Sequence, residues 1–506
     1  MMRRGFAGLL LLIGLCVAGP ARAEWRRAVS THFVLYSEGS DEDMRAVAGK
    51  LERFDGLLRQ LMPVPAESQT RRLTIYMPRS VGAIEQMLGG YGVGGFYRAD
   101  TAGPFAVVPR AQLSDDFQSD VVLFHEYMHH FMLQHFATAY PSWFVEGYAE
   151  LFSNTRFERD GSIVIGSFAD HRGMTLRADP PALRDLMFGE HRVSASLFYA
   201  NAWALTHYLL ISDERPNQLN RYISLIGAGR PREAAAQEAF GSIDALERDF
   251  RRYRRRATIP TLILRLQQAP ATGPIAIETL GRAEEALLWL LVEYRTEPEG
   301  GFRLNLIRHV RTRVAQLDND PAALQLLADV EALGGNLEAA GRAADAVLAR
   351  QPEAPHALLR KGLTEIALLE RAHDTDRAHW IAAREWLRRA NAAGPDDPMI
   401  LYEYYRAFDR QGLQAPPPAV AALERALELV PQSWELRQRF ARELVRARRY
   451  NFATSVLSPV AFSAHGGWRT EAAQRVIELI RGLREGAEPP AEALVVPTRP
   501  ANRERN

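Results

Sequence analysis

The sequence predicts an α+β domain followed by an all-α domain that is built of paired helices. Between about residues 31 and 256, short alternating segments typical of strands are interspersed with segments of helical spacing. From about Pro260 onward the chain is rich in Ala, Leu and Arg and has few β-branched residues. With 506 residues, the chain is long enough for more than one hydrophobic core.

The composition is that of a globular protein, with 47% hydrophobic and 24% charged residues. The formal net charge is +1, so no overall field favours binding to nucleic acid or to a membrane surface. We therefore expect no nucleic-acid partner.

The first 23 residues have the organisation of a signal peptide. A pair of arginines precedes an apolar stretch at 6–19, and residues 21–23 have the small-x-small pattern of a cleavage site. We expect cleavage after Ala23, a periplasmic or secreted protein, and no stable membrane span after cleavage; an uncleaved anchor is the alternative. The single cysteine, Cys16, lies within this segment, so His, Asp and Glu remain as ligands for any metal site.

The α+β domain is placed at residues 24–257. Alternating patterns predict strands at 31–38, 71–78 and 103–110, with a glycine-rich loop before the third. Helical spacing predicts helices at 41–62, 80–89, 121–136, 196–210 and 242–256.

The helix at 121–136, with the sequence VVLFHEYMHHFMLQHF, places polar side chains in an apolar run and contains an HExxH motif. Residues four apart share a helix face, so His125 and His129 can both reach one zinc ion at about 2.0–2.1 Å. Glu126 is turned about 100° away from His125 and can face a water molecule without binding the metal. Buried imidazoles need strong partners, which a metal ion provides.

A third ligand is required, and His135 is one candidate because it completes the spacing HExxH-x5-H. Sites of that kind need glycine three residues after the second histidine, where this chain has Met132. If the helix continues, His135 lies about 120° around the axis from His129 and cannot converge with it.

The favoured third ligand is Glu146, in the segment PSWFVEGYAELF at 141–152. Pro141 interrupts the chain after the first helix, and a second helix then brings Glu146 back towards the two histidines. Glu150 lies one turn further along the same face, where it can accept a hydrogen bond from the outer nitrogen of a ligating imidazole, with His125 preferred.

HExxH, with sixteen residues between His129 and the glutamate of W-x-x-E-G-x-A-E, resembles the gluzincin zinc metallopeptidases, particularly the bacterial peptidase MA-like group. The resemblance covers about residues 31–256. It implies Zn²⁺ bound by His125, His129 and Glu146, with Glu126 as the general base. Members of the group often carry Asn before the ligand glutamate, where this chain has Val145.

The resemblance implies hydrolysis of peptide bonds, and an endopeptidase acting on a protein or peptide substrate is expected. By analogy with related peptidases, backbone near the strand at 103–110 is expected to pair with the substrate as an added strand. Tyr199 is the candidate donor to the oxyanion, with an ordinary core tyrosine as the alternative. Hydrolysis of a cell-wall peptide is also compatible with such a site.

The segment at 258–484 contains helix pairs at intervals, with small residues between paired helices and a closing proline, for example at 321–353 and 419–460. This pattern resembles the tetratricopeptide (TPR) repeat in degenerate form; a generic helical bundle is the alternative. Such repeats imply a concave surface that binds the substrate or a partner protein. The proline-rich tail at 485–506 is expected to be disordered.

The predicted fold class is therefore an α+β zincin-like metallopeptidase domain followed by an all-α tetratricopeptide-like solenoid. The alternative function is a TPR scaffold with a structural or inactive metal site.

Overall fold

The computed structural model describes residues 25–62, 64, 71–88, 95–110, 119–136, 138–168, 170–189, 192–256, 258–270, 272–461 and 467–496. The expected signal peptide, residues 1–23, lies outside them.

A six-stranded sheet with the order β4-β5-β3-β2-β1-β9 forms the centre of the molecule. The strands are β1 (Arg26–Val29), β2 (Phe33–Ser37), β3 (Leu73–Met77), β4 (Phe96–Asp100), β5 (Gly103–Val107) and β9 (Ala276–Thr279). β2, β3 and β5 run parallel to one another, whereas β4 lies antiparallel at one edge. β1 is antiparallel to both β2 and β9.

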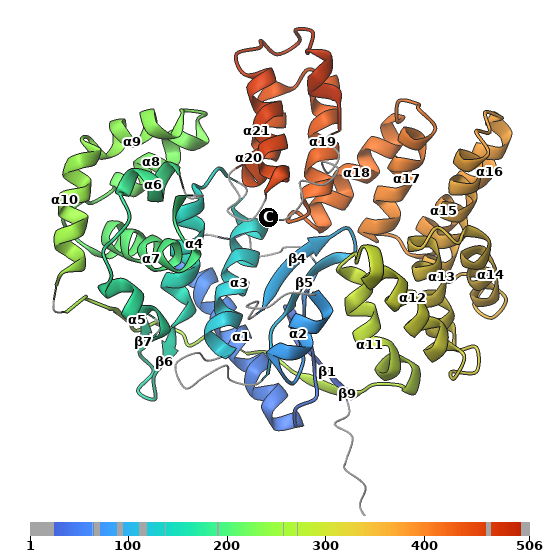
Figure 1. Cartoon of the computed structure of the whole chain (residues 1–506), viewed down its shortest axis with the longest axis horizontal. Helices are drawn as coiled ribbons and strands as arrows, with labels where there is room; N and C mark the ends of the chain where they lie inside the picture. Colours follow the sequence, from blue (N-terminus) through green and yellow to red (C-terminus); the bar gives the residue numbers. More distant parts are fainter. Residues whose placement is uncertain are drawn as a thin grey trace, which may run out of the picture.

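Both faces of this sheet are covered, because alternate side chains of each strand enter different hydrophobic cores. Ile75 and Ala106 belong to the core that includes α1 (Asp41–Leu61) and α3 (Ser119–His135). Tyr76 and Phe105 belong to a second core, formed with α2 (Val81–Leu88) and α11 (Arg282–Arg295). The first helix of the all-α region thus packs directly on the sheet, as Figure 1 shows.

The strands differ from the sequence-based expectation at the edges of the sheet. The segment at 96–100, expected to be part of a glycine-rich loop, is the edge strand β4. The strand at 103–107 is internal and paired on both sides, so the sheet edge near it is the adjacent strand β4. β9 and β8 (Leu262–Leu264) lie beyond residue 257 yet pair with the N-terminal strands β1 and β7 (Ile163–Ile165).

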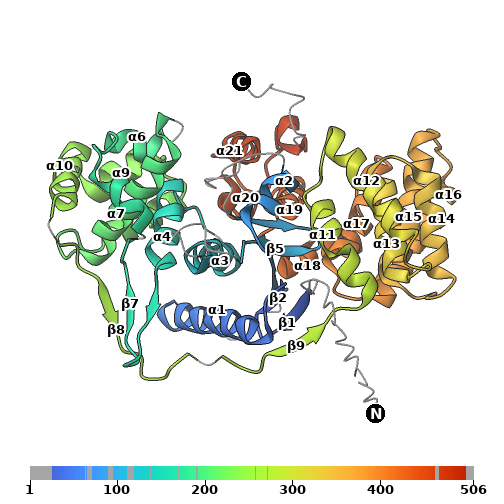
Figure 2. The ribbon, with the colours of Figure 1, turned by 60° about the horizontal axis from the view of Figure 1, so that its bottom comes forward.

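A group of helices follows α3 and forms a lobe on one side of the sheet (Figures 1 and 2). α4 (Ser142–Ser153) packs against both α3 and α7 (Ala195–Ile211). The remaining elements of the lobe are β6 (Arg156–Phe157), α5 (Asp170–Arg177), α6 (Leu183–Phe188), α8 (Gln218–Gly227), α9 (Arg232–Phe240) and α10 (Ile243–Arg254).

The C-terminal half is an array of paired helices. Consecutive helices pack in pairs, α13 on α14, α15 on α16, α17 on α18 and α19 on α20. Small buried residues such as Ala328 and Ala343 allow the close approach that their positions predicted. The helices are α12 (Gly300–Val314), α13 (Pro321–Leu333), α14 (Leu337–Leu348), α15 (Pro355–Arg371), α16 (Arg377–Ala393), α17 (Pro398–Arg410), α18 (Pro417–Leu429), α19 (Trp434–Arg446), α20 (Tyr450–Ala461) and α21 (Trp468–Ile480).

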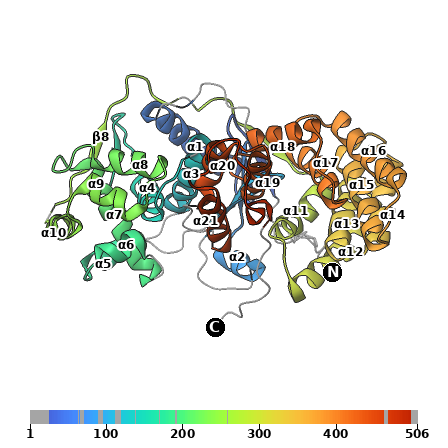
Figure 3. The same cartoon turned by 90° about the horizontal axis from the view of Figure 1, so that it is seen from above.

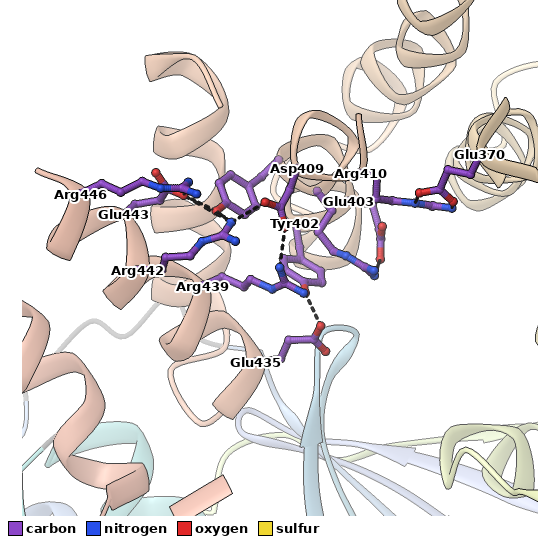
Figure 4. A network of polar contacts seen from close by, with 12 residues as sticks. Glu370, Tyr402, Glu403, Asp409, Arg410, Glu435, Arg439, Arg442, Glu443 and Arg446 are labelled. Atoms are coloured by element: carbon purple, nitrogen blue, oxygen red, sulfur yellow. Dashed lines mark hydrogen bonds and ion pairs between the residues drawn. The ribbon is translucent and has the colours of Figure 1, made fainter. Parts of the chain in front are cut away.

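A polar network joins two of these pairs, as Figure 4 shows in close-up. Arg439 and Arg442 on α19 donate to the two carboxylate oxygens of Asp409 on α17, at 2.6 and 2.8 Å. Arg442 also donates to the hydroxyl of Tyr405 at 2.6 Å. Charge-assisted bonds of this kind constrain the direction in which one pair stacks on the next.

The array curves, so its first helix and its last helices both reach the N-terminal half (Figures 1 and 3). α11 packs on the sheet, while α19 contacts β4. Just before β3, the Arg71 side chain forms an ion pair with Asp397 at 3.0 Å, and the backbone N–H of Arg71 donates to the carbonyl oxygen of Leu429. The two halves therefore meet over several elements.

The end of the chain departs from the expected disorder at 485–506. Residues 485–496 are ordered, and a 3-10 helix at Ala491–Leu494 packs between α19 and α21 with Ala493 buried. Residues 497–506 lie outside the described part. Among the described residues, no helix combines the length and the apolar character that crossing a membrane requires.

Candidate metal centre

The helix α3 presents His125 and His129 on one face, with their Nε2 atoms 3.1 Å apart. Contacts with α1 fix the rotation of α3 about its own axis. Phe124 stacks on Phe54 of α1 at a centroid distance of 4.1 Å, and the Tyr127 hydroxyl donates to Asp55 at 2.6 Å. The two imidazoles are thereby held on the face turned away from α1.

Helix α4 brings Glu146 to the same point. Pro141 occupies its N-cap position in an extended conformation, which ends the preceding segment and starts the new helix. The Oε2 atom of Glu146 lies 3.4 Å from Nε2 of His125 and 3.5 Å from Nε2 of His129. The side chain of Glu146 is fully buried.

These three side chains fit a tetrahedral divalent metal. An ion with ligand bonds of about 2.0–2.1 Å and tetrahedral angles holds its ligand atoms about 3.3–3.4 Å apart. The three separations, 3.1, 3.4 and 3.5 Å, are close to that spacing. Two imidazole nitrogens and one carboxylate oxygen are a ligand set that suits zinc and leaves a fourth position for water or substrate.

Glu150, one turn beyond Glu146 on α4, lies on the outer side of His125. Its Oε1 atom is 3.6 Å from Nδ1 of His125, longer than a hydrogen bond but on the side of the ring opposite the ligating nitrogen. The carboxylate is buried, with 5% of its side chain exposed, so it remains close to the imidazole. This position can orient the ring and increase its basicity.

The surrounding carboxylates make the cluster attractive to a cation. Burial alone lowers the pKa of His125, but the hydrogen bond with Glu146 and the charges of Glu150, Glu146 and Glu126 together raise it to about 9. The same negative potential favours a divalent ion.

Glu126 is half-buried and lines a cavity of about 300 Å³ together with His129 and Glu146. Glu126 therefore lies at the same cavity as two of the three ligand residues.

Tyr97 on the edge strand β4 lines the same cavity and was not identified from the sequence. Its hydroxyl lies 3.2 Å from Nδ1 of His130. Burial, with the charges of Glu126 and Asp100, holds the pKa of Tyr97 well above its usual value, so the phenol keeps its proton. No sequence spacing relates Tyr97 to HExxH, because strand pairing brings it there.

Tyr199, the sequence-based candidate for the oxyanion donor, lies at the start of α7 against His125. The two rings meet edge to face with centroids 6.1 Å apart, and the tyrosine is half-buried. Tyr199 is not among the residues that line the cavity beside Glu126.

His135 does not join the cluster. α3 continues without interruption through Met132 to His135, whose ring packs on Phe131 at a centroid distance of 4.6 Å. This is the geometry expected where no glycine allows the chain to leave the helix.

A second group of close acidic and imidazole side chains, His32, Glu52 and Asp55, lies beneath α3. Its members bind one another and their neighbours. His32 Nδ1 lies 2.7 Å from Glu52, and Asp55 accepts from Arg59 at 2.7 Å and from Tyr127. We interpret this group as an ion-pair network that holds α3 on α1.

Comparison with known proteins finds no matching family model and no matching curated protein. A solved TPR protein of Thermus thermophilus, TTC0263, is 18% identical, with 38% of this chain and 97% of that chain covered at a TM-score of 0.32. The MamA RS-1 ArsTM double mutant is 20% identical, with 39% and 97% covered and a TM-score of 0.26. Yeast Tom70 is 13% identical, with 68% and 71% covered and a TM-score of 0.25. These are structures to which the chain is similar, and none of the three exceeds 20% identity.

Proposed function

We propose that the protein is a zinc-dependent peptidase of the periplasm or the extracellular space, with Glu126 as its general base. One observation carries this proposal: three ligand atoms from α3 and α4 lie 3.1–3.5 Å from one another, and Glu126 shares a cavity with two of those ligands. A purely structural site has no use for a carboxylate beside an open position.

When bound, zinc supplies Lewis acidity, which polarises a peptide carbonyl and lowers the pKa of water. Glu126 takes the proton of the attacking water at its carboxylate and later delivers it to the leaving amine. Glu150 holds the ring of His125 in place while this occurs. The edge strand β4, which pairs only with β5 among the described strands, offers its free side to an extended peptide.

The test is hydrolysis of a peptide library by the purified mature protein with zinc, with chelator, and after restoration of zinc. Cleavage that disappears with chelator and returns with zinc supports the proposal. Absence of cleavage in a protein that binds one zinc ion per chain contradicts it.

A TPR scaffold is the second candidate function, and the TPR-like array itself favours it. In that case the metal site would only stabilise the N-terminal half, and the repeats would bind a partner protein. Removal of zinc would then lower the melting temperature of the protein, while no peptide would be cleaved under any condition.

A further inference from the structure

The cavity beside the three ligand atoms has a second wall, which comes from the repeat half. Glu126, His129 and Glu146 line one side. The other side is lined by residues 432–433, which lie between α18 and α19, by residues 434–435 at the start of α19, and by Val460 of α20. A molecule that reaches the metal ligands through this cavity therefore contacts the helical repeats.

Specific contacts fix the position of this second wall. The Gln432 side chain donates to the side-chain amide oxygen, Oε1, of Gln134 on α3 at 3.2 Å and is itself buried. Behind it, the buried guanidinium of Arg437 donates to the carbonyls of Pro431 at 2.6 Å and Val456 at 3.1 Å. The loop is thereby tied to α3 on one side and to α20 on the other.

The edge strand is fixed to the repeat half as well. Arg295 at the end of α11 donates to both carboxylate oxygens of Asp100, at 3.0 and 2.9 Å, and to the carbonyl of Gly103 at 2.8 Å. These bonds hold the β4–β5 hairpin against the first repeat helix. The width of the cavity between β4, α3 and α19 is thus set by bonds at two separate places.

The cavity presents apolar groups on both walls. Met132 and Val145 lie on the side of the metal ligands, and Trp434 and Val460 lie on the side of the repeats. Its volume, about 300 Å³, is at the lower end for ligand cavities and suits one or two residues of a peptide. A folded protein surface cannot enter a space of that size.

We propose that the repeat half forms the side-chain subsite of the peptidase, and that the substrate is an extended, unfolded segment with a bulky apolar residue next to the cleaved bond. This inference rests on the proposed function. Trp434 and Val460 are the residues that determine the preference, because they complete the apolar wall from the repeat half.

The experiment measures cleavage of peptides that differ only in the residue on either side of the cleaved bond. Trp434→Ala is expected to lower kcat/KM for peptides with Leu or Phe there by about tenfold or more, mainly through KM. Val460→Ile, which adds one methylene to the wall, is expected to shift the preference towards smaller side chains. Zinc content is expected to stay unchanged in both variants.

Leu304→Ala is the matched control, since this α12 residue is 68% exposed and does not line the cavity. It is expected to leave the preference unchanged. An unchanged preference in both Trp434→Ala and Val460→Ile overturns the inference. So does equal cleavage of one protein in its folded form and in its reduced, unfolded form.

Failure of the proposed function is recognised separately. If the zinc-loaded protein cleaves no peptide, binding of the same peptides is measured by calorimetry. Weaker binding of apolar peptides to Trp434→Ala then supports the subsite, whereas equal binding to both proteins excludes it.

Discussion

At Gly147, α4 approaches α7 so closely that a β-carbon would lie 2.2 Å from the carbonyl oxygen of Ala202. The same β-carbon would lie 2.2 Å from the hydroxyl of Thr206. Because backbone cannot move aside as a flexible side chain can, any larger residue must separate the two helices. Gly147 follows the ligand Glu146 directly, so this contact determines where the carboxylate lies.

Gly147→Ala is therefore expected to lower the free energy of unfolding by about 1–3 kcal/mol and to weaken zinc binding. Urea unfolding and zinc titration measure the two effects. Gly301→Ala is the control, because a β-carbon on that α12 glycine would meet nothing within 4 Å outside its own stretch of helix, and alanine favours a helix. Equal stability and zinc affinity in Gly147→Ala and wild-type protein would show that α4 has room to shift.

Glu126→Gln is expected to keep zinc and to lower peptide hydrolysis by about 10²–10⁴-fold, because the amide cannot accept a proton. Metal analysis and peptide cleavage on the same sample measure both. Glu158→Gln, at an exposed position beside a turn, serves as the control and is expected to leave hydrolysis unchanged. Undiminished hydrolysis by Glu126→Gln would exclude the role of general base.

Glu146→Ala and Glu150→Ala are expected to differ in degree. The first removes a ligand atom and is expected to lower zinc affinity by several orders of magnitude. The second removes only the carboxylate beside the outer nitrogen of His125, so zinc affinity is expected to fall by about 10–100-fold. Competition with a chromophoric chelator measures both affinities. Equal affinity in Glu146→Ala and wild-type protein would rule out the proposed ligand set.

Tyr127→Phe removes the 2.6 Å hydrogen bond to the buried Asp55. A loss of about 1–3 kcal/mol in the free energy of unfolding is expected, because the carboxylate loses one donor without access to water. The matched control is Tyr148→Phe, because the Tyr148 hydroxyl donates to the sulfur of Met62, a weak acceptor, at 3.6 Å. If both variants unfold at the same urea concentration, the network beneath α3 does not stabilise the helix.

The parts of the site that could be predicted from the sequence depend on local spacing. The shared position of His125 and His129 follows from the periodicity of an α-helix. The positions of Glu146 and Glu150 follow from a break at Pro141 and a second helix after it. Their positions could be predicted because both segments are short and strongly apolar.

The parts that could not be predicted depend on contacts between distant segments. β4 has the sequence FYRAD, which shows no alternation, so neither the strand nor Tyr97 was expected. Gln432 meets α3 only because the helical array curves back over the sheet. Pairing of β9 with β1 likewise gives no signal in either segment alone.

That pairing has a consequence for how the chain acquires its shape. During synthesis, the residues of β1 appear first, but the strand that completes their hydrogen bonds is not made until residues 276–279. Contacts at such separation form slowly, and unpaired strands in the meantime invite aggregation. Until then, one side of β1 stays unpaired. A chaperone that covers nascent strands would therefore benefit this protein more than a protein in which neighbouring strands of the sheet are consecutive in sequence.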